Sequence, residues 1–242
     1  TGWDAQQLKG GYKAFRRHVV ESLPPLIHGL RLVVLCGQTG TAKTRILQAM
    51  AAQGAQVLDL EGMARHKGSM LGAWPGQPQP PQKQFETQLY TALKRLDPSR
   101  PVYTESESAR IGSISLPLDM VAHLRASTDL VEIDASPESR LDFLLRDYAY
   151  LGDDPAAFAD LLGRFKQLQG NETITRWQAW AQEGNLPELF AELMSRHYDP
   201  QYSRSLGRNF SHWDKRHTVK ADDLSDAGIA KLAETVRGLF EG

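Results

Sequence analysis

The sequence predicts an α/β fold in which helices flank a parallel sheet, and three observations predict it. Apolar segments of strand length recur along the chain, with segments of helical spacing between them. The first of these strands runs directly into a glycine-rich loop that opens a helix. Residues 137–196 have an almost purely helical pattern, which predicts a helical insertion or subdomain on the sheet.

Length and composition limit the class of protein. With 242 residues, the chain can form one large domain or a domain with an appendage. The formal net charge of −1 gives no global attraction to nucleic acid, so such binding would need a local basic patch. The sequence has no apolar run of membrane-spanning length, Thr1–Asp4 is not a signal peptide, and the single cysteine suits a reducing compartment. We therefore expect a cytoplasmic protein that does not bind membranes.

The first strand is expected at Leu32–Cys36, after a lead-in that contains a basic amphipathic stretch around Arg16 and Arg17. Its five apolar residues suit a strand buried on both faces, where Cys36 would be a structural thiol. Four further strands are expected at Gln56–Leu60, Pro101–Thr104, Leu130–Asp134 and His217–Lys220. In such sheets, ligands bind beyond the carboxyl ends of the strands.

The loop after the first strand, Gly37–Thr44, fits the phosphate-binding pattern G-x-x-x-x-G-K-[ST] except at Ala42. Its backbone N–H groups would form an anion nest at the N-terminus of the next helix. Lys43 would add a cation for the outer phosphate, and the Thr44 hydroxyl could ligate magnesium. Since the Ala42 side chain stands where the backbone approaches phosphate, we expect altered affinity or geometry. The alternative is a glycine-rich turn that binds nothing.

Helical spacing after this loop predicts a helix that ends near Gly54, and further helices at 84–96, 116–124 and 226–240, the last capped by Ser225. The expected organisation is therefore a lead-in segment over residues 1–30, a P-loop NTPase-like α/β domain over residues 31–136 and 209–242, and a helical subdomain over residues 137–208. The apolar stripes of the helical subdomain are better explained by core packing than by a binding platform.

Pairs of carboxylates follow two of the expected strands. Asp59 and Glu61 end the second strand and would share one face of it, as would Glu105 and Glu107 after the third strand. Such pairs beside a phosphate loop can hold magnesium or orient a nucleophile. The alternatives are a solvated strand end with a helix cap for the first pair, and exposed acids at a strand exit for the second.

Two further segments are unusual. The run Arg65–Ser69 supplies cations, a flexible turn and a hydroxyl, as anion sites do, although such runs are common in surface loops; the Gly- and Pro-rich segment 73–82 after it suits a mobile lid. Residues 196–220 contain six Arg and Lys against two Asp, a net charge of +4, with four Tyr, Phe and Trp interleaved. RNA contacts use this combination, and the alternative is a solvated edge whose aromatic residues pack inward.

The sequence Val57–Ser69 resembles tRNA 2-selenouridine synthase, the bacterial enzyme that modifies wobble uridine. Further resemblance lies in Gln82 with Phe85-Glu86, in Glu105–Ser108 with Ile111-Gly112, and in Tyr198-Asp199-Pro200 with Tyr202 and Ser205. The resemblance covers Gly10 to about Val219 and concerns the P-loop part of that family. Members usually carry an N-terminal rhodanese-like domain with the selenium-transfer cysteine, so we expect this chain alone to lack the selenation step.

The resemblance implies two reactions on a wobble 2-thiouridine in the anticodon stem-loop of tRNA. The sulfur is first geranylated from geranyl diphosphate, and selenium from selenophosphate then replaces the geranylated sulfur, without ATP hydrolysis. Under this hypothesis the catalytic residues are Lys43, His66, Glu105 and Glu107. The anion-binding residues are Gly37, Gln38, Thr39, Gly40, Thr41, Ala42, Lys43, Thr44, Lys67, Gly68, Ser69 and Arg110. Arg16, Arg17, Tyr202, Arg204 and Arg208 would contact tRNA, and Thr44 with Asp59 would hold magnesium.

Two other functions fit parts of the pattern. An ATP-dependent small-molecule kinase shares the loop, the α/β alternation and a helical lid, but gives the run His66–Ser69 no obvious role. A non-catalytic tRNA-binding module that depends on the rhodanese-like domain would explain the basic segment alone.

Overall fold

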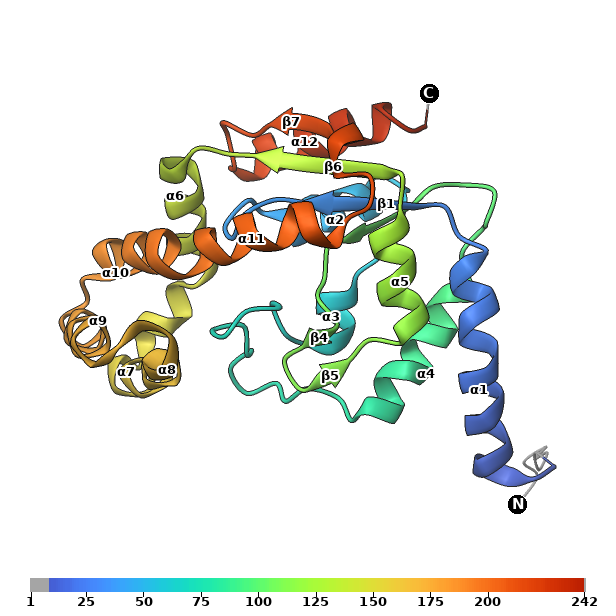
Figure 1. Ribbon diagram of the computed structural model, residues 1–242, viewed down its shortest axis with the longest axis horizontal. Coiled ribbons are helices and arrows are strands. Elements are labelled where there is room, and N and C mark those ends of the chain that lie inside the picture. Colours follow the sequence, from blue (N-terminus) through green and yellow to red (C-terminus); the bar gives the residue numbers. More distant parts are fainter. Residues whose placement is uncertain (1–8, 242) are drawn as a thin grey trace, which may run out of the picture.

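The computed structural model describes residues 9–241, apart from the side chains of residues 205–207, and it contains a five-stranded parallel sheet (Figure 1). The strand order is β2-β3-β1-β6-β7, so the strand before the glycine-rich loop lies at the centre. The strands are β1 (Leu32–Cys36), β2 (Gln56–Leu58), β3 (Val102–Glu105), β6 (Asp129–Asp134) and β7 (His217–Lys220). The parallel α/β fold is therefore confirmed.

Helices cover both faces of this sheet. One face packs against α1 (Gly11–His28), α4 (Gln82–Leu93) and α5 (Leu118–Ala126), through residues such as Val19 and Phe85. The other face packs against α2 (Lys43–Ala52) and α12 (Asp226–Gly238). Since side chains alternate along a strand, Val34 belongs to the first core and Leu35 to the second. The helix α1, which belongs to the segment expected as a lead-in, therefore packs against the sheet as part of the first core.

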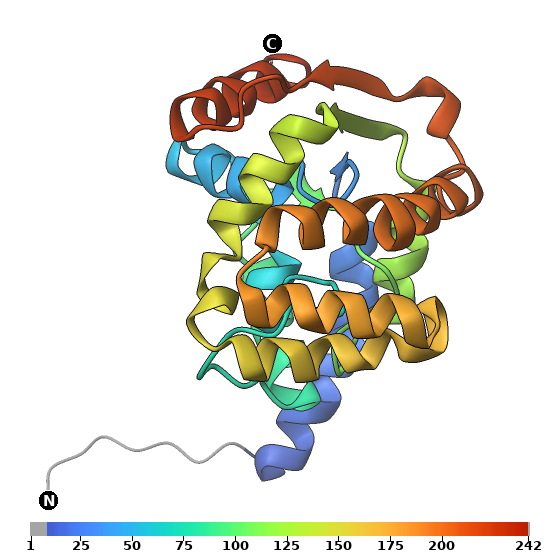
Figure 2. The same cartoon turned by 90° about the vertical axis from the view of Figure 1, so that its left-hand side faces the viewer.

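A third apolar core holds the helical region together. This region lies beyond the carboxyl ends of the strands, and Figure 2 views it from that side. The helices of this region are α6 (Pro137–Asp147), α7 (Pro155–Leu162), α8 (Lys166–Gln169), α9 (Asn171–Glu183), α10 (Leu186–Leu193) and α11 (Asp199–Asn209). Short turns join them at η1 (Ala149–Asp153), η2 (Gly163–Phe165) and η3 (Met194–Tyr198), and η4 (Trp213–Lys215) follows α11. The core centres on Trp177, Phe165 and Phe158, which confirms that these stripes serve packing, while the predicted domain boundaries stay a prediction.

The second strand is shorter than expected, and the difference matters for the site. The strand β2 ends at Leu58, and Asp59 is the N-cap of α3 (Leu60–Ala64), where its Oδ1 accepts a hydrogen bond of 2.6 Å from the Gly62 N–H. An aspartate in this position satisfies a helix donor that would otherwise lack a partner. The prediction that Asp59 and Glu61 share a strand face is therefore wrong, and the helix-cap alternative is right for Asp59.

The remaining boundaries shift by a few residues. The helix after the loop ends as expected, with Gly54 in a left-handed conformation just beyond it, and Ser225 caps α12 by accepting from the Gly228 N–H. The helix predicted at 116–124 begins two residues later, because Pro117 precedes its first turn. A small antiparallel hairpin, β4 (Arg110–Ile111) with β5 (Ile114–Ser115), was not predicted from the sequence.

Candidate functional site

A cavity of about 660 Å³ opens at the carboxyl ends of the central strands, between the glycine-rich loop and the helical region. This is where ligands bind in parallel α/β sheets, and the volume is typical of a small-molecule site. We call the side formed by Gly37, Thr39–Arg45, Glu61 and Glu107 the phosphate-loop wall. We call the apolar and aromatic part of the remaining lining the aromatic wall, and it consists of Met70, Trp74, Phe143, Leu144, Tyr148, Tyr150, Leu168, Tyr198 and Tyr202. Polar side chains, among them Gln48, Gln77, Asp147, His197 and Gln201, also line the cavity.

The phosphate-loop wall is closed on itself by hydrogen bonds. Lys43 Nζ donates to the carbonyl oxygens of Gly37 at 2.7 Å and of Gln38 at 3.3 Å, and Thr41 Oγ1 donates to Gln38 at 2.9 Å. Burial lowers the pKa of Lys43, against the opposing influence of nearby carboxylates. An entering anion would offer this ammonium a better partner than two neutral carbonyls.

Ala42 stands where the loop pattern has glycine, and it adopts a backbone conformation that glycine favours. It is the N-cap of α2 and has a left-handed conformation, φ 58° and ψ 24°, although its side chain is buried in the core behind the loop. Glycine adopts this conformation freely, whereas for a residue with a Cβ it costs roughly 1–2 kcal/mol. The loop thus keeps the geometry that the pattern normally obtains from glycine.

Glu61 takes the place that the sequence suggested for Asp59. Thr44 Oγ1 donates to Glu61 Oε2 at 2.6 Å, and Glu61 lines the cavity from the first turn of α3. Asp59, in contrast, turns its carboxylate to the cap of the same helix. If magnesium is bound here, Thr44 and Glu61 are therefore better placed to hold it than Asp59 is. Within residues 9–241, no three His, Cys, Asp or Glu side chains are grouped as a metal site.

Three glutamates meet beside Lys43. Glu105 is 1% exposed and its Oε1 accepts from the Glu61 N–H at 2.7 Å. Burial, followed by the charges of Asp59, Glu61 and Glu107, raises the pKa of Glu105 well above its usual value. Burial and Glu61 likewise raise the pKa of Glu107 to about 8, so this side chain is mostly protonated at neutral pH. Glu61 and Glu107 are hydrogen-bonded and together hold a proton at the cavity surface.

The run that follows α3 contributes Lys67, Gly68 and Ser69 to the cavity lining. Gly68 has φ +63°, and a Cβ there would lie 2.7 Å from Glu61 Oε1 and 3.0 Å from the Glu107 carboxylate, so only glycine fits. Lys67 lines the cavity, but its ammonium donates to the carboxylate of Asp147 at 2.7 Å and lies 4.0 Å from the Tyr148 ring. Ser69 also lines the cavity, beside Tyr148 and Tyr198.

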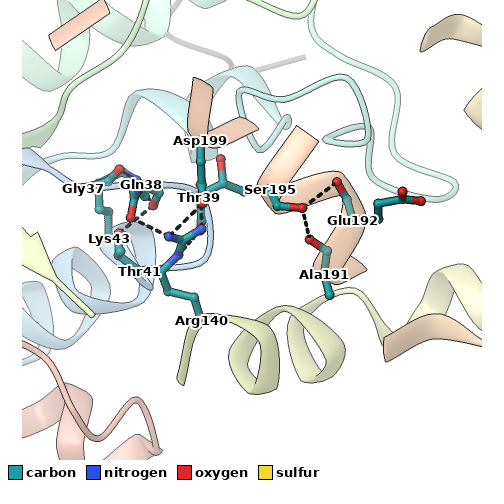
Figure 3. A network of polar contacts seen from close by, with 10 residues as sticks. All are labelled: Gly37, Gln38, Thr39, Thr41, Lys43, Arg140, Ala191, Glu192, Ser195 and Asp199. Atoms are coloured by element: carbon teal, nitrogen blue, oxygen red, sulfur yellow. Dashed lines mark hydrogen bonds and ion pairs between the residues drawn. The ribbon is translucent and has the colours of Figure 1, made fainter. Parts of the chain in front are cut away.

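Arg140 is the residue that sequence reasoning missed. It is 1% exposed, comes from α6, and donates to the loop carbonyl of Thr39 and to Asp199 at the start of α11 (Figure 3). The available signal was a charge on an apolar helical face, since Arg140 precedes Phe143 and Leu144 by three and four residues.

Several predicted site residues lie elsewhere in the described structure. The ring of His66 packs beneath the run, beside Gly72 and Gly112, and burial with the charge of Arg164 lowers its pKa. Arg110 is exposed on β4. Arg16 is largely buried between α1 and α4, where it pairs with Glu86. Of the described residues, neither these three nor Asp59 and Arg17 line the cavity, and their predicted roles stay predictions.

In the basic segment, residues 196–220, some of the cationic side chains form ion pairs and others are exposed. Arg196, Arg216 and Lys220 form ion pairs with Glu192, Glu132 and Asp134, respectively. Arg204 and Arg208 are exposed on α11, as is Lys215 beyond it. The aromatic residues point inward: Phe210 is buried in the first core, and Tyr198 and Tyr202 line the cavity, where Tyr202 is hydrogen-bonded to the Gly37 backbone. The alternative of inward-packed aromatic residues therefore holds for these three.

No helix within the described part of the chain is long and apolar enough to cross a membrane. The chain matches the model of the tRNA 2-selenouridine synthase AAA domain over residues 30–181.

Curated relatives are similar over most or part of the chain, and each is named tRNA 2-selenouridine synthase. The protein from Alcanivorax borkumensis is 34% identical over 86% of this chain and 63% of its own length. The protein from Shewanella denitrificans is 31% identical over 93% of this chain and 66% of its own length. The protein from Marinobacter nauticus is 37% identical over 61% of this chain and 39% of its own length. The chain thus spans less than two thirds of these relatives. Since the family model matches more than half of it, the chain belongs to the tRNA 2-selenouridine synthase AAA domain family.

Proposed function

We propose that this chain takes part in tRNA modification, by transferring a geranyl group from geranyl diphosphate to the sulfur of a wobble 2-thiouridine. The observation that carries the proposal is the contrast between the two walls of one cavity. The phosphate-loop wall offers Lys43 and a helix N-terminus to a diphosphate, and the aromatic wall offers an apolar surface to a prenyl chain. The names of the relatives support tRNA as the second substrate.

The same contrast bears on the kinase alternative. A nucleotide needs polar partners for its base and ribose, whereas a prenyl chain needs apolar surface, which Met70, three further aliphatic or phenyl side chains and the rings of four tyrosines and a tryptophan supply. Buried hydrogen-bonding groups that find no partner cost binding energy, so a nucleoside is a poor fit to an apolar wall. The geometry therefore favours a prenyl diphosphate over ATP.

The proposed reaction makes one carbon–sulfur bond and breaks the carbon–oxygen bond to diphosphate. Negative charge then develops on the leaving diphosphate, where Lys43 and the loop N–H groups stabilise it. The base loses its N3 proton when its sulfur is alkylated. The Glu61–Glu107 pair lines the cavity and can accept this proton, because a carboxyl pair that holds one proton still has basic oxygen atoms.

The second reaction, selenium transfer from selenophosphate, is proposed to use the same loop, since selenophosphate carries a phosphate-like group. If magnesium takes part, the Thr44 hydroxyl and the Glu61 carboxylate would bind it, and the ion would neutralise charge on the diphosphate. The participation of a rhodanese-like domain, and the roles of His66 and Arg110, stay predictions.

The test is to incubate the purified chain with geranyl diphosphate and tRNA that carries 2-thiouridine, then to digest the RNA and analyse its nucleosides by mass spectrometry. We expect a nucleoside heavier by one geranyl group, which is lost in Lys43→Ala. Unmodified RNA after incubation with the folded chain, or phosphorylation of a small molecule at the expense of ATP, would contradict the proposal.

A further inference from the structure

We propose that Arg140 is a positioning residue that couples the occupancy of the phosphate loop to RNA binding along α11. This inference rests on the proposed function, because it takes the exposed cations of α11 as an RNA contact. It adds a physical connection between the two substrates: a buried guanidinium that contacts both of their binding elements.

The geometry of Arg140 joins three segments that are distant in sequence. Its Nε donates to the Thr39 carbonyl at 3.0 Å, and its Nη1 donates to the side-chain oxygen of Gln38 (Figure 3). Its Nη1 and Nη2 also donate to the two carboxylate oxygens of Asp199, at 3.3 and 2.7 Å. The guanidinium thus bridges two consecutive residues of the loop and the first residue of α11.

Because Arg140 is buried, the loss of any of these contacts is energetically costly. The side chain of Arg140 is 1% exposed, whereas that of Asp199 is 27% exposed. A buried guanidinium is costly unless its donors are satisfied, and separation of the loop from α11 would leave some donors of Arg140 unpaired, so the two elements stay together. A lysine in its place would keep the charge but lose the planar fork that reaches both sides.

The loop end of this connection is sensitive to an anion. In the structure, Lys43 Nζ donates to the carbonyl of Gln38, and the side chain of Gln38 accepts from Arg140. When a phosphate attracts Lys43, this bond is exchanged for one to the ligand. Gln38, whose carbonyl loses the bond from Lys43, is therefore in direct contact with the Arg140 guanidinium.

The other end of the connection carries the candidate RNA contacts. Asp199 begins α11, which follows the π-helical turn η3 and presents Arg204 and Arg208 on its exposed side. A carboxylate in the first turn of a helix is favourable, and Arg140 fixes its position. An anion that draws Lys43 away from the Gln38 carbonyl therefore changes the contacts of a residue that Arg140 links to the start of α11, so RNA binding along α11 responds to the occupancy of the loop.

The expected coupling is positive and reciprocal. Pyrophosphate should tighten the binding of a thiolated anticodon stem-loop by about tenfold, a factor within the ordinary range of linkage between two sites. Direct repulsion between the two anions acts in the opposite sense. It does not require Arg140, and salt at physiological ionic strength screens it beyond about 8 Å.

The experiment measures the affinity of a fluorescent thiolated stem-loop by anisotropy, with and without saturating inorganic pyrophosphate. It compares the wild type with Arg140→Lys and Asp199→Asn, after thermal unfolding has shown that each variant is folded. Arg176→Lys is the matched control, because Arg176 pairs with Glu192 at 2.7 Å within the helical region and does not touch the loop. We expect the tenfold effect to fall to about twofold or less in the first two variants and to persist in the control.

The outcomes separate the two proposals. A wild-type chain that binds pyrophosphate but no stem-loop would overturn the proposed function and this inference with it. A wild-type chain that binds both without positive coupling would overturn this inference alone. The inference is also overturned if Arg140→Lys and Asp199→Asn couple the ligands as strongly as the wild type does, since a merely structural pair would change stability and leave the coupling factor unchanged.

Discussion

The two walls of the cavity differ in how they meet a ligand. Polar groups of the phosphate-loop wall are satisfied internally, with Lys43 on the carbonyls of Gly37 and Gln38 and Thr44 on Glu61. The aromatic wall instead presents mainly rings and aliphatic side chains to the cavity, such as those of Trp74, Tyr150 and Leu168. The phosphate-loop wall must exchange hydrogen bonds to bind a ligand, whereas the aromatic wall binds by apolar contact.

This difference separates affinity from selectivity. Exchange at the phosphate-loop wall responds to charge, which every diphosphate supplies, so that wall cannot tell a prenyl diphosphate from inorganic pyrophosphate. Burial at the aromatic wall depends on the area and shape of the organic group. We therefore expect variants of the first wall to weaken all diphosphates and variants of the second to weaken only prenylated ones.

The largest effect is expected at the phosphate-loop wall. Lys43→Ala removes a charge-assisted contact worth about 2 kcal/mol and should weaken pyrophosphate and geranyl diphosphate equally, by about thirtyfold, in titration calorimetry. Lys220→Ala, which removes an exposed lysine from the β7 edge, is the control. A Lys43 variant that loses affinity for geranyl diphosphate alone would contradict the division between the walls.

A pH effect should mark the same wall. Because folding raises the pKa of Glu107 from its usual 4.5 to about 8, the folded protein binds this proton more tightly than the unfolded chain does. The resulting stability is present at acid pH and is lost as pH rises from about 4.5 through about 8. Glu107→Gln should therefore lose less thermal stability than the wild type between about pH 6 and pH 9.

The control for this pH effect is Glu188→Gln, at an exposed glutamate in the first turn of α10. Its melting temperature should follow the wild-type pH dependence. Parallel melting curves for the wild type and Glu107→Gln across the same range would show that Glu107 does not hold a proton in the folded state.

A smaller, selective effect is expected at the aromatic wall. Leu168 lines the cavity and is 58% exposed, so Leu168→Ser changes the wall with little cost to the fold. Loss of about 1 kcal/mol of apolar burial should weaken geranyl diphosphate about fivefold and leave pyrophosphate unchanged. Leu239→Ser, at a 41% exposed leucine just beyond α12, is the matched control. If Leu168→Ser and the wild type bound geranyl diphosphate with equal affinity, the prenyl chain would not contact this wall.

The smallest effect concerns the strained residue of the loop. Ala42→Gly relieves a left-handed alanine and should stabilise the protein by up to about 1 kcal/mol, a rise of roughly 2–4 °C in melting temperature. Ala51→Gly, at an exposed position of the same helix, should destabilise by about 1 kcal/mol. Effects of the same sign at both positions would show that Ala42 is not strained.

The two walls also differ in how far the sequence predicts them. The phosphate-loop wall is local: eight consecutive residues after a buried strand determine the position of Lys43 and Thr44, and the structure confirms the strand, the loop and the helix. The strand ends at Leu58, two residues earlier than expected, so the alternation of side chains along a strand does not apply to Asp59 and Glu61. Asp59 caps the helix α3, and Glu61 lines the cavity in its stead.

The aromatic wall depends on distant contacts. Helical spacing places Leu144 and Tyr148 on one apolar stripe, but it cannot say whether a side chain lies inside a core or at the edge of a cavity, since both need the same pattern. Arg140 and Asp199 are 59 residues apart, and nothing local pairs them. Such contacts arise when the helical region folds back onto the loop, which propensity and periodicity do not encode.

The most direct test of the two-wall account is a calorimetric comparison of geranyl diphosphate, inorganic pyrophosphate and ATP on the wild-type chain under one set of conditions. The account predicts that geranyl diphosphate binds most tightly, that pyrophosphate competes with it at the loop, and that ATP binds most weakly. ATP that binds more tightly than geranyl diphosphate, or pyrophosphate that equals it, would contradict the account.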